Sequence, residues 1–506
     1  MTHKKLVGGC AVGVTVFALA YLAPSTVGRG SEMDEGAVVA YPSRVLDGLV
    51  PHRDFLTFYG PGNLWLVAGA FATFGESVGT ERAVGMLYRL IIVLAVFLLG
   101  LRLAGSMAGV IAGVIATVLM GEELVWAYAT YGALAFGLLG LALLSWSTTA
   151  SSERRREIGL AAAGLAGGAA VLVRFDFGPA VVLAALPLLT LVPARTRWWY
   201  AGGFSGAMTM YGFHLALVGP ERIARVVGDL LATGPGRELP LPRPWVYPAT
   251  LLTGAGLILM LFLVVGAVLW RRRRYVPVPQ ALVAISLFEL AVLPWTLFRP
   301  DPSHIRPIAI VPLSLLPALA LFAIGAVTLH QSLRRGISLA AVALTLAAVL
   351  VSGDFTLDRA RAVRSVPSAY REFYDDDSVG ARLAVERVRS LARPGESLFV
   401  GPQDLRRTNY GPTYMYFLLH ELRPASYYME MNPGTANREG SGLPEELRRA
   451  DWLILTSEWD AWDEPNESTV FGPSEPNEVV RDLFCARFEA GQYRLYERCD
   501  RVSVAG

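Results

Sequence analysis

The sequence has few lysines, few cysteines and little net charge, and each scarcity excludes a class of protein. Its only lysines are Lys4 and Lys5, and the formal net charge is +2. Nucleic-acid binders carry large, clustered basic surfaces, so we expect no nucleic-acid partner. The three cysteines, Cys10, Cys485 and Cys499, are too few and too scattered for a zinc or iron–sulfur site.

What the chain has instead is long apolar runs. Of its 506 residues, 53% are hydrophobic and 17% are charged, and several runs approach or exceed the roughly 20 residues needed to cross a bilayer. We therefore predict a polytopic α-helical membrane protein with about eleven transmembrane helices. The first run resembles a signal peptide, but because ten more follow we interpret it as an uncleaved anchor. The predicted spans are 6–23, 83–101, 107–120, 131–146, 158–173, 177–192, 198–218, 246–270, 276–297, 307–327 and 337–351.

Arginines predict the orientation of these spans. Every short arginine-rich loop falls on the same side if the N-terminus is cytoplasmic, as the positive-inside rule requires. These arginines are Arg102, Arg154, Arg155, Arg156, Arg195, Arg197, Arg271 to Arg274, Arg334 and Arg335. We expect a multi-pass protein of the plasma (inner) membrane whose residues 1–352 form the transmembrane domain. Its first outer loop is 24–82, and residues 353–506 form a soluble extracytoplasmic domain.

The composition of residues 353–506 is that of a small α/β domain, a normal domain size. We predict a helix at 379–391, strands at 398–401, 452–456 and 493–496, and helices at 444–449 and 477–488. No glycine-rich phosphate-binding loop is recognisable in it. A disulfide between Cys485 and Cys499 is allowed on an oxidising side of the membrane. A turn near 489–492 would instead place Cys485 opposite Tyr496, so the sequence leaves the disulfide open.

Ionisable residues at the outer ends of the spans are the candidates for chemistry, because charge is costly beside lipid. Carboxylates can serve as a general base, histidines as acid or ligand, and arginines as phosphate binders. The candidates are Asp34, Glu35, His52, Arg53, Asp54, Arg89, Arg174, Asp176, Arg299, Asp301 and His304. Further arginines on the same face suit a phosphate-bearing lipid. They are Arg82, Arg222, Arg225, Arg237, Arg243 and Arg306.

Each group also has a simpler structural interpretation. Asp34 and Glu35 suit the first turn of a helix, and Val38, Tyr41 and Val45 fit a helix on the membrane surface that Pro42 would kink. Neighbours on a helix point about 100° apart, so only one of the two acids can face a reacting atom.

The other two groups stand in short outer loops. Arg174 and Asp176 can simply pair and close a helical hairpin. The loop "FRPDPSHIRP" (298–307) suits phosphate or a metal, although two potential ligands do not define a metal site.

The stretch "DEGAVVAYPSRVLDGLVPHRDFLTFYGPGNLWLVAGAFATFGES", followed by "ERAVGMLYRL", resembles the first outer loop of the GT-C glycosyltransferases. It is most similar to the protein O-mannosyltransferase and aminoarabinose-transferase-like branch (glycosyltransferase family 39-like). That family has an acidic pair after the first span, an aromatic segment and an arginine before the second span. The resemblance is specific over Asp34 to Arg89 and architectural elsewhere.

The resemblance implies an enzyme that moves a sugar from a polyprenyl-phosphate donor to a hydroxyl of a glycan, lipid or protein acceptor. Asp34 matches the catalytic acid and Glu35 its companion, and Arg89 falls near a basic residue for lipid phosphate. His52 replaces a usual tyrosine, which points to this segment for substrate preference. The substrate-binding set then comprises His52, Arg53, Asp54, Tyr59, Arg89, Arg174, Asp176, Arg299, Asp301 and His304. No cofactor and no metal ligand are assigned, and the sequence leaves the need for a divalent cation open.

Two other functions remain as alternatives. A transporter or flippase for a lipid-linked sugar would carry charge in the middle of its spans and often internal repeats, and we recognise neither pattern. A non-catalytic envelope scaffold would use the soluble domain to bind a wall polymer or another protein.

Overall fold

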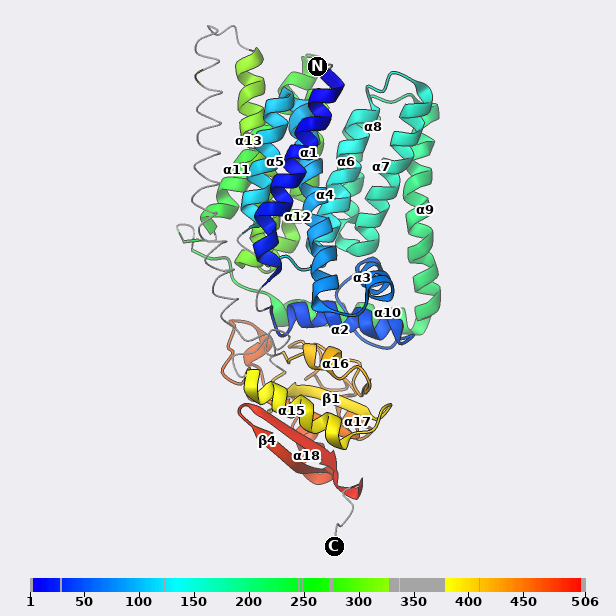
Figure 1. The fold of residues 1–506 in the computed structure, drawn as a ribbon, viewed down its shortest axis with the longest axis vertical. Helices are drawn as coiled ribbons and strands as arrows, with labels where there is room; N and C mark the ends of the chain where they lie inside the picture. The colour runs from blue at the N-terminus through cyan, green and yellow to red at the C-terminus, as the bar shows by residue number, and fades with distance from the viewer. Residues whose placement is uncertain are drawn as a thin grey trace.

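The computed structural model describes residues 3–27, 30–121, 124–243, 246–247, 249–272, 277–326, 336, 378–408 and 410–501. In these residues the chain forms a helical bundle and, at one end of it, a smaller domain built around a sheet (Figure 1). The two parts follow one another along the longest axis of the molecule, which confirms the predicted fold class.

The bundle reproduces the first ten predicted spans as helices. They are α1 (His3–Leu22), α4 (Val78–Ala104), α5 (Ser106–Met120), α6 (Ala129–Ser147), α7 (Glu153–Val173), α8 (Gly178–Leu189), α9 (Ala194–Val218), α11 (Ala249–Arg271), α12 (Val278–Phe298) and α13 (Pro302–Ala326). Seven helices in the described residues are long and apolar enough to cross a membrane, so the chain is a multi-pass membrane protein. The eleventh segment, 337–351, and the domain boundary at 352 lie outside the described residues, so the count of eleven stays a prediction.

Three further helices lie near the end of the bundle that faces the small domain: α2 (Asp34–Leu46), α3 (Pro61–Phe74) and α10 (Pro220–Arg237). α2 crosses this end roughly perpendicular to the bundle (Figure 1) and continues through Pro42. It is the helix expected at the membrane surface, but the small domain covers it. A Cβ added to Gly36 would stand 2.7 Å from the backbone N of Tyr414. Only glycine therefore allows this approach of α2 to the small domain.

The small domain has a five-stranded sheet of order β2-β1-β3-β5-β4. β1 pairs in parallel with β2 and β3, whereas β5 is antiparallel to β3 and β4. Its elements are α15 (Ser378–Leu391), β1 (Ser397–Pro402), α16 (Tyr414–Leu418), β2 (Arg423–Pro424), α17 (Leu443–Leu447), β3 (Trp452–Thr456), η4 (Glu467–Thr469), α18 (Glu475–Leu483), β4 (Phe484–Ala490), β5 (Tyr493–Arg498) and η5 (Cys499–Arg501). The helix predicted at 379–391 and the three predicted strands are present.

The helix predicted at 477–488 is wrong in its second half. α18 ends at Leu483, and the chain continues as β4, because this segment gains a ladder of hydrogen bonds with β5. An irregularity between Ala486 and Phe488 shifts the register, so that Cys485 lies opposite Glu497. Cys485 and Cys499 form a disulfide with a Cα–Cα distance of 5.0 Å. The sequence left this disulfide open, and the structure contains it.

Hydrogen bonds and side-chain packing join the bundle end and the small domain. Arg44 of α2 donates to the backbone O of His420 at 2.8 Å and also to that of Tyr416. The backbone N–H of Leu56 donates to the backbone O of Tyr427 at 2.8 Å, and its side chain packs in the small domain's core. These contacts fix the first outer loop and the small domain relative to each other.

Candidate functional site

A cavity of about 520 Å³ lies where the bundle meets the small domain. Seven segments far apart in sequence line it: the start of α2, the loop before α3, the α5–α6 loop, the α7–α8 turn, the C-terminal half of α10, the α12–α13 turn and loops of the small domain. Consecutive helices run in opposite directions, so these turns meet at one end of the bundle (Figure 1). Its volume is within the usual range for ligand sites, about 300–1,000 Å³.

The cavity gathers many of the residues that the sequence singles out. Those that line it are Asp34, Tyr59, Arg174, Asp176, Arg299, Asp301 and His304. Aromatic side chains make up much of the remaining wall: Phe58, Trp126, Tyr128, Phe175, Trp295, Phe298, Tyr410, Trp459 and Trp462. A wall of this kind offers charge for a phosphate and apolar faces for a sugar or a lipid chain.

Asp34 stands at the first position of α2, with its side chain partly buried. Its backbone N–H donates to Ser31 Oγ at 3.0 Å, which caps the helix start. Burial raises the pKa of the Asp34 carboxyl, and the nearby positive charges of Arg237 and Arg299 offset only part of this rise. A carboxylate with a raised pKa is a stronger base than one in water.

Two of the cavity's arginines are already paired. Arg174 donates to Asp176 Oδ1 at 3.0 Å and to Oδ2 at 2.6 Å. The hairpin-closing pair considered from the sequence is therefore present, and it also lines the cavity. Arg299 donates to Asp301 Oδ2 at 2.9 Å and to Glu464 Oε2 at 2.9 Å. These two arginines shape the wall through their carboxylate partners.

Arg237 is a third cavity arginine, at the end of α10. In the described part of the chain its guanidinium forms no hydrogen bond or ion pair. It lies 5.3 Å from the ring centroid of Phe58 and 5.9 Å from that of Tyr410. Burial opposes its charge, but Tyr410, Glu430 and Asp34 raise the pKa of Arg237. The sequence places Arg237 among the outer-face arginines without marking it as a site residue. Its position on an amphipathic outer helix is the signal that could have done so.

His304 is oriented by Asp301. Its Nδ1 lies 2.8 Å from Asp301 Oδ1, and its ring packs on Trp295 with a centroid distance of 4.6 Å. Burial alone would raise the pKa of Asp301, but hydrogen bonds from His304 and Ser303 together lower it. Among the residues that the structure describes, no group of three His, Cys, Asp or Glu side chains could hold a metal ion.

Glu35 and Arg89 lie outside this cavity and support its wall. Glu35 accepts two hydrogen bonds from Arg82, at 2.6 and 2.9 Å, and is buried. Arg89 donates to the backbone O of Trp126 at 2.7 Å and to that of Leu124 at 3.2 Å. Trp126 is a cavity residue, so Arg89 acts on the cavity through the loop that it holds.

The "PHRDF" segment also lies elsewhere. The buried His52 Nδ1 is 3.0 Å from His214 Nε2 of α9. Arg53 and Asp54 form an ion pair at 2.7 Å and line a separate groove on the other side of the loop.

The architecture described above is the GT-C fold of membrane glycosyltransferases. Two solved structures of ArnT from Cupriavidus metallidurans share it, both at 12% identity. The complex with undecaprenyl phosphate has a TM-score of 0.52 over 99% of this chain and 98% of ArnT. The apo state has a TM-score of 0.51 over 97% and 98%. No family model and no curated protein sequence matches the chain.

The Archaeoglobus fulgidus oligosaccharyltransferase in complex with Zn and sulfate has a lower TM-score of 0.49. The match has 12% identity over 97% of this chain and 73% of that protein. At this level of identity a match to a solved structure shows the fold alone, so the activity has to be argued from the cavity itself.

Proposed function

We propose that the protein is a glycosyltransferase that moves a sugar from a polyprenyl-phosphate donor to an acceptor hydroxyl at the outer face of the membrane. The observation that carries this proposal is that Asp34 and Arg237 line the same aromatic-lined cavity. Asp34 supplies a base with a raised pKa, and Arg237 supplies a positive charge that forms no ion pair with a carboxylate of the described residues.

In the proposed reaction the acceptor oxygen attacks the anomeric carbon of the donor sugar. A glycosidic bond forms as the bond between this carbon and the phosphate oxygen breaks. The hydroxyl proton passes to the Asp34 carboxylate, and the polyprenyl phosphate leaves with its electron pair. Arg237 stabilises the negative charge that develops on the phosphate. No nucleotide-binding motif is needed, because the leaving group already carries charge.

The place of the cavity supports a lipid-linked donor. It lies at the end of a membrane bundle, where a prenyl chain can remain in the bilayer while its phosphate reaches Arg237. ArnT, which has the same fold, is solved in complex with undecaprenyl phosphate. We propose the outer face because the small domain stands at this end, opposite the arginine-rich loops.

Replacing Asp34 with Asn tests the role of the base. Asparagine keeps the shape but cannot take a proton, so we expect sugar transfer to fall by about 10²-fold or more. The assay uses membrane vesicles with polyprenyl-phosphate sugars and follows transfer to an acceptor. Asp482→Asn, an exposed acid on α18 (side chain 59% exposed), is the matched control and should keep full activity. Full transfer by Asp34→Asn would remove Asp34 from catalysis, and no transfer by the wild type with common donors would favour a scaffold.

One observation favours a transporter as the second candidate. Glu289 lies midway along α12, fully buried, and neither carboxylate oxygen has a hydrogen-bond partner in the described residues. No mid-span ionisable residue is predicted from the sequence, and Glu289 shows that this prediction is wrong. A charge at this depth is typical of transport proteins. If the protein is a transporter, Glu289→Gln should abolish movement of the lipid-linked sugar and Asp34→Asn should leave it intact. If the protein is the proposed enzyme, Asp34→Asn should abolish sugar transfer and Glu289→Gln should leave it intact.

A further inference from the structure

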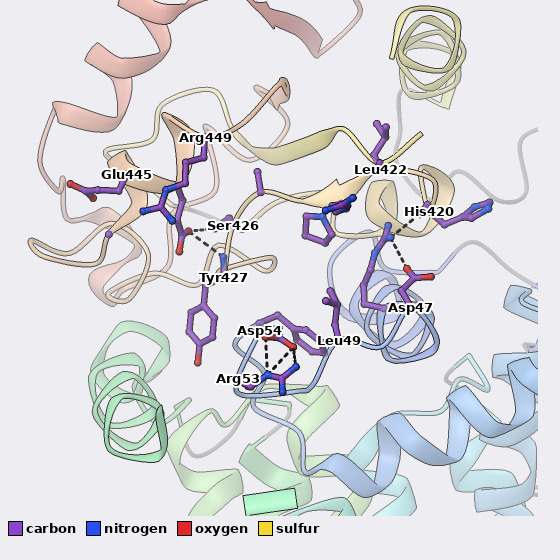
Figure 2. A pocket seen from close by; sticks show the side chains of 18 of the residues that line it. Asp47, Leu49, Arg53, Asp54, His420, Leu422, Ser426, Tyr427, Glu445 and Arg449 are labelled. Atoms are coloured by element: carbon purple, nitrogen blue, oxygen red, sulfur yellow. Dashed lines mark hydrogen bonds and ion pairs between the residues drawn. The ribbon is translucent and has the colours of Figure 1, made fainter. Parts of the chain in front are cut away.

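A second hollow lies between the first outer loop and the small domain, and its lining is polar. It has a volume of about 690 Å³ and is lined by residues of 44–55, the start of α10 and the segments 420–427 and 442–449. Figure 2 shows Tyr427 and Arg449 of the small domain on one side and Arg53 and Asp54 of the outer loop on the other. We call this hollow the arginine groove.

Three arginines of the arginine groove form no ion pair in the described residues. Arg222, Arg423 and Arg449 all line it and are exposed, and in the described part of the chain none of them forms an ion pair. Arg222 lies over the Tyr427 ring at 5.8 Å, which holds it at the groove. Guanidinium groups bind carboxylates and phosphates through two parallel hydrogen bonds. The groove therefore suits a ligand with negative charge.

The groove also carries acids, which restrict the ligand. Asp47, Asp54 and Glu445 line it, with side chains 49%, 27% and 56% exposed. Carboxylates would repel a densely anionic surface, but they accept hydrogen bonds from sugar hydroxyls. The Glu446 carboxylate is already satisfied by Ser426 Oγ at 2.8 Å. Mixed charge of this kind fits a chain of hydroxyl-rich rings with an occasional anionic group better than it fits a lipid surface.

The arginine groove and the catalytic cavity share two segments. Arg53 and Phe55 face the groove, whereas Phe58 and Tyr59, a few residues on, face the cavity. Along α10, Arg222 lines the groove and Arg237 lines the cavity. Fifteen helical positions at about 1.5 Å each span roughly 22 Å, which is the length of an oligosaccharide of a few rings.

We propose that the arginine groove binds an anionic oligosaccharide as part of the acceptor. The acceptor chain lies in the groove with its carboxylate or phosphate groups on the three arginines, and its terminal hydroxyl extends to Asp34. The identification of this ligand as the acceptor rests on the proposed function, but binding in the groove can be measured without transfer.

The test compares two triple variants of the full chain in phosphatidylcholine nanodiscs. R222Q/R423Q/R449Q removes the three groove cations, and R387Q/R393Q/R481Q removes three exposed arginines elsewhere on the small domain. Tetragalacturonic acid is the anionic probe and maltotetraose the neutral one. We expect the Kd for tetragalacturonic acid to rise about tenfold or more in the groove variant and to change less than about twofold in the control. Maltotetraose should not compete.

Asp34→Asn separates this proposal from the proposed function. It should bind tetragalacturonic acid like the wild type even though transfer is lost. Equal binding of tetragalacturonic acid by both triple variants, or competition by maltotetraose, would overturn the proposal that the groove binds an anionic oligosaccharide. Displacement of the probe when phosphatidylglycerol replaces phosphatidylcholine would assign the arginines to lipid headgroups instead. If the groove variant loses binding but the wild type transfers no sugar with common donors, the groove stands and the proposed function fails.

Discussion

At the scale of single residues, what distinguishes Asp34 is the absence of a paired cation. The other carboxylates of the cavity, Asp176 and Asp301, are held by Arg174 and Arg299. Asp34 forms no ion pair in the described residues and has only Ser31 Oγ as its hydrogen-bond partner. A carboxylate without a fixed cation can accept a proton, whereas a paired one loses its partner when it does so.

The sequence could predict Asp34 but not which cation serves it. Its place after the first span and the resemblance around it both point to Asp34. The sequence favours Arg89, which the resemblance places near a basic residue for lipid phosphate, and puts Arg237 only among the further outer-face arginines. Only the fold shows that Arg89 donates hydrogen bonds to backbone carbonyls of the loop around Trp126, whereas Arg237 lines the cavity. Which arginine lines the cavity depends on contacts with segments distant in sequence, and spacing along the chain does not predict these contacts.

His52 gives a prediction about pH. Burial, aided by His214, lowers the pKa of His52 to about 4, below the roughly 6.5 of an unfolded histidine. The unfolded chain therefore binds more protons between pH 6.5 and 4, so stability falls as the pH falls through this window. His52 adopts a φ of +66°, which asparagine tolerates. His52→Asn should flatten the loss of stability between pH 7 and 5 by about 2 kcal/mol.

Thermal unfolding in detergent at both pH values measures this effect. His420→Asn, at a side chain that is 64% exposed, is the control and should keep the wild-type pH dependence. Identical pH dependence in the wild type and His52→Asn would show that another group controls acid unfolding.

At the scale of elements, α10 holds the cavity together from outside the bundle. Its buried Asp229 pairs with Arg438 of the small domain and lies 3.7 Å from Arg225. This contact fixes the helix whose last residue, Arg237, faces Asp34. α10 is thus a tether between the two parts of the molecule as well as a carrier of the proposed phosphate-binding residue.

Arg438→Gln tests this tether. It leaves the buried Asp229 with a weaker partner, so we expect α10 to open more easily by about 1–2 kcal/mol. Amide hydrogen exchange of α10 should accelerate, and the KM for the donor should rise because Arg237 is less well placed. The Asp229→Asn/Arg438→Gln pair removes the buried charge together with its partner and should recover much of the protection. Unchanged exchange in Arg438→Gln would contradict the tether.

Elements with strong periodicity were predicted, and those governed by tertiary contacts were not. The long apolar helices and strands β1, β3 and β5 follow from composition and pattern. α3 and α10, helices in the outer loops, are not predicted, although the amphipathic pattern of α10 is a signal for it. The sequence predicts a helix where β4 forms, and this prediction is wrong because the pairing of β4 with β5 outweighs local propensity.

At the scale of the whole molecule, the described arginine-rich loops and the small domain lie at opposite ends of the bundle. Arg102 ends α4, Arg154 starts α7 and Arg195 starts α9, all at the end far from the sheet (Figure 1). Arg273, Arg274, Arg334 and Arg335 lie outside the described residues. The positive-inside rule then predicts that the small domain is extracytoplasmic. The disulfide between Cys485 and Cys499 fits this side, because such bonds persist in oxidising compartments.

A reporter fused after Gly506 tests this orientation. Alkaline phosphatase, which needs an oxidising compartment, should be active there, and green fluorescent protein exported in the same position should be dark.

Thiol trapping in intact cells adds an independent measurement: Cys485 and Cys499 should resist alkylation until a reductant is added. Cys485→Ser/Cys499→Ser should destabilise the small domain by about 3 kcal/mol, because the bond closes a loop of 14 residues. A cytoplasmic reporter signal together with freely reacting thiols would reverse the topology and move the proposed cavity to the inner face.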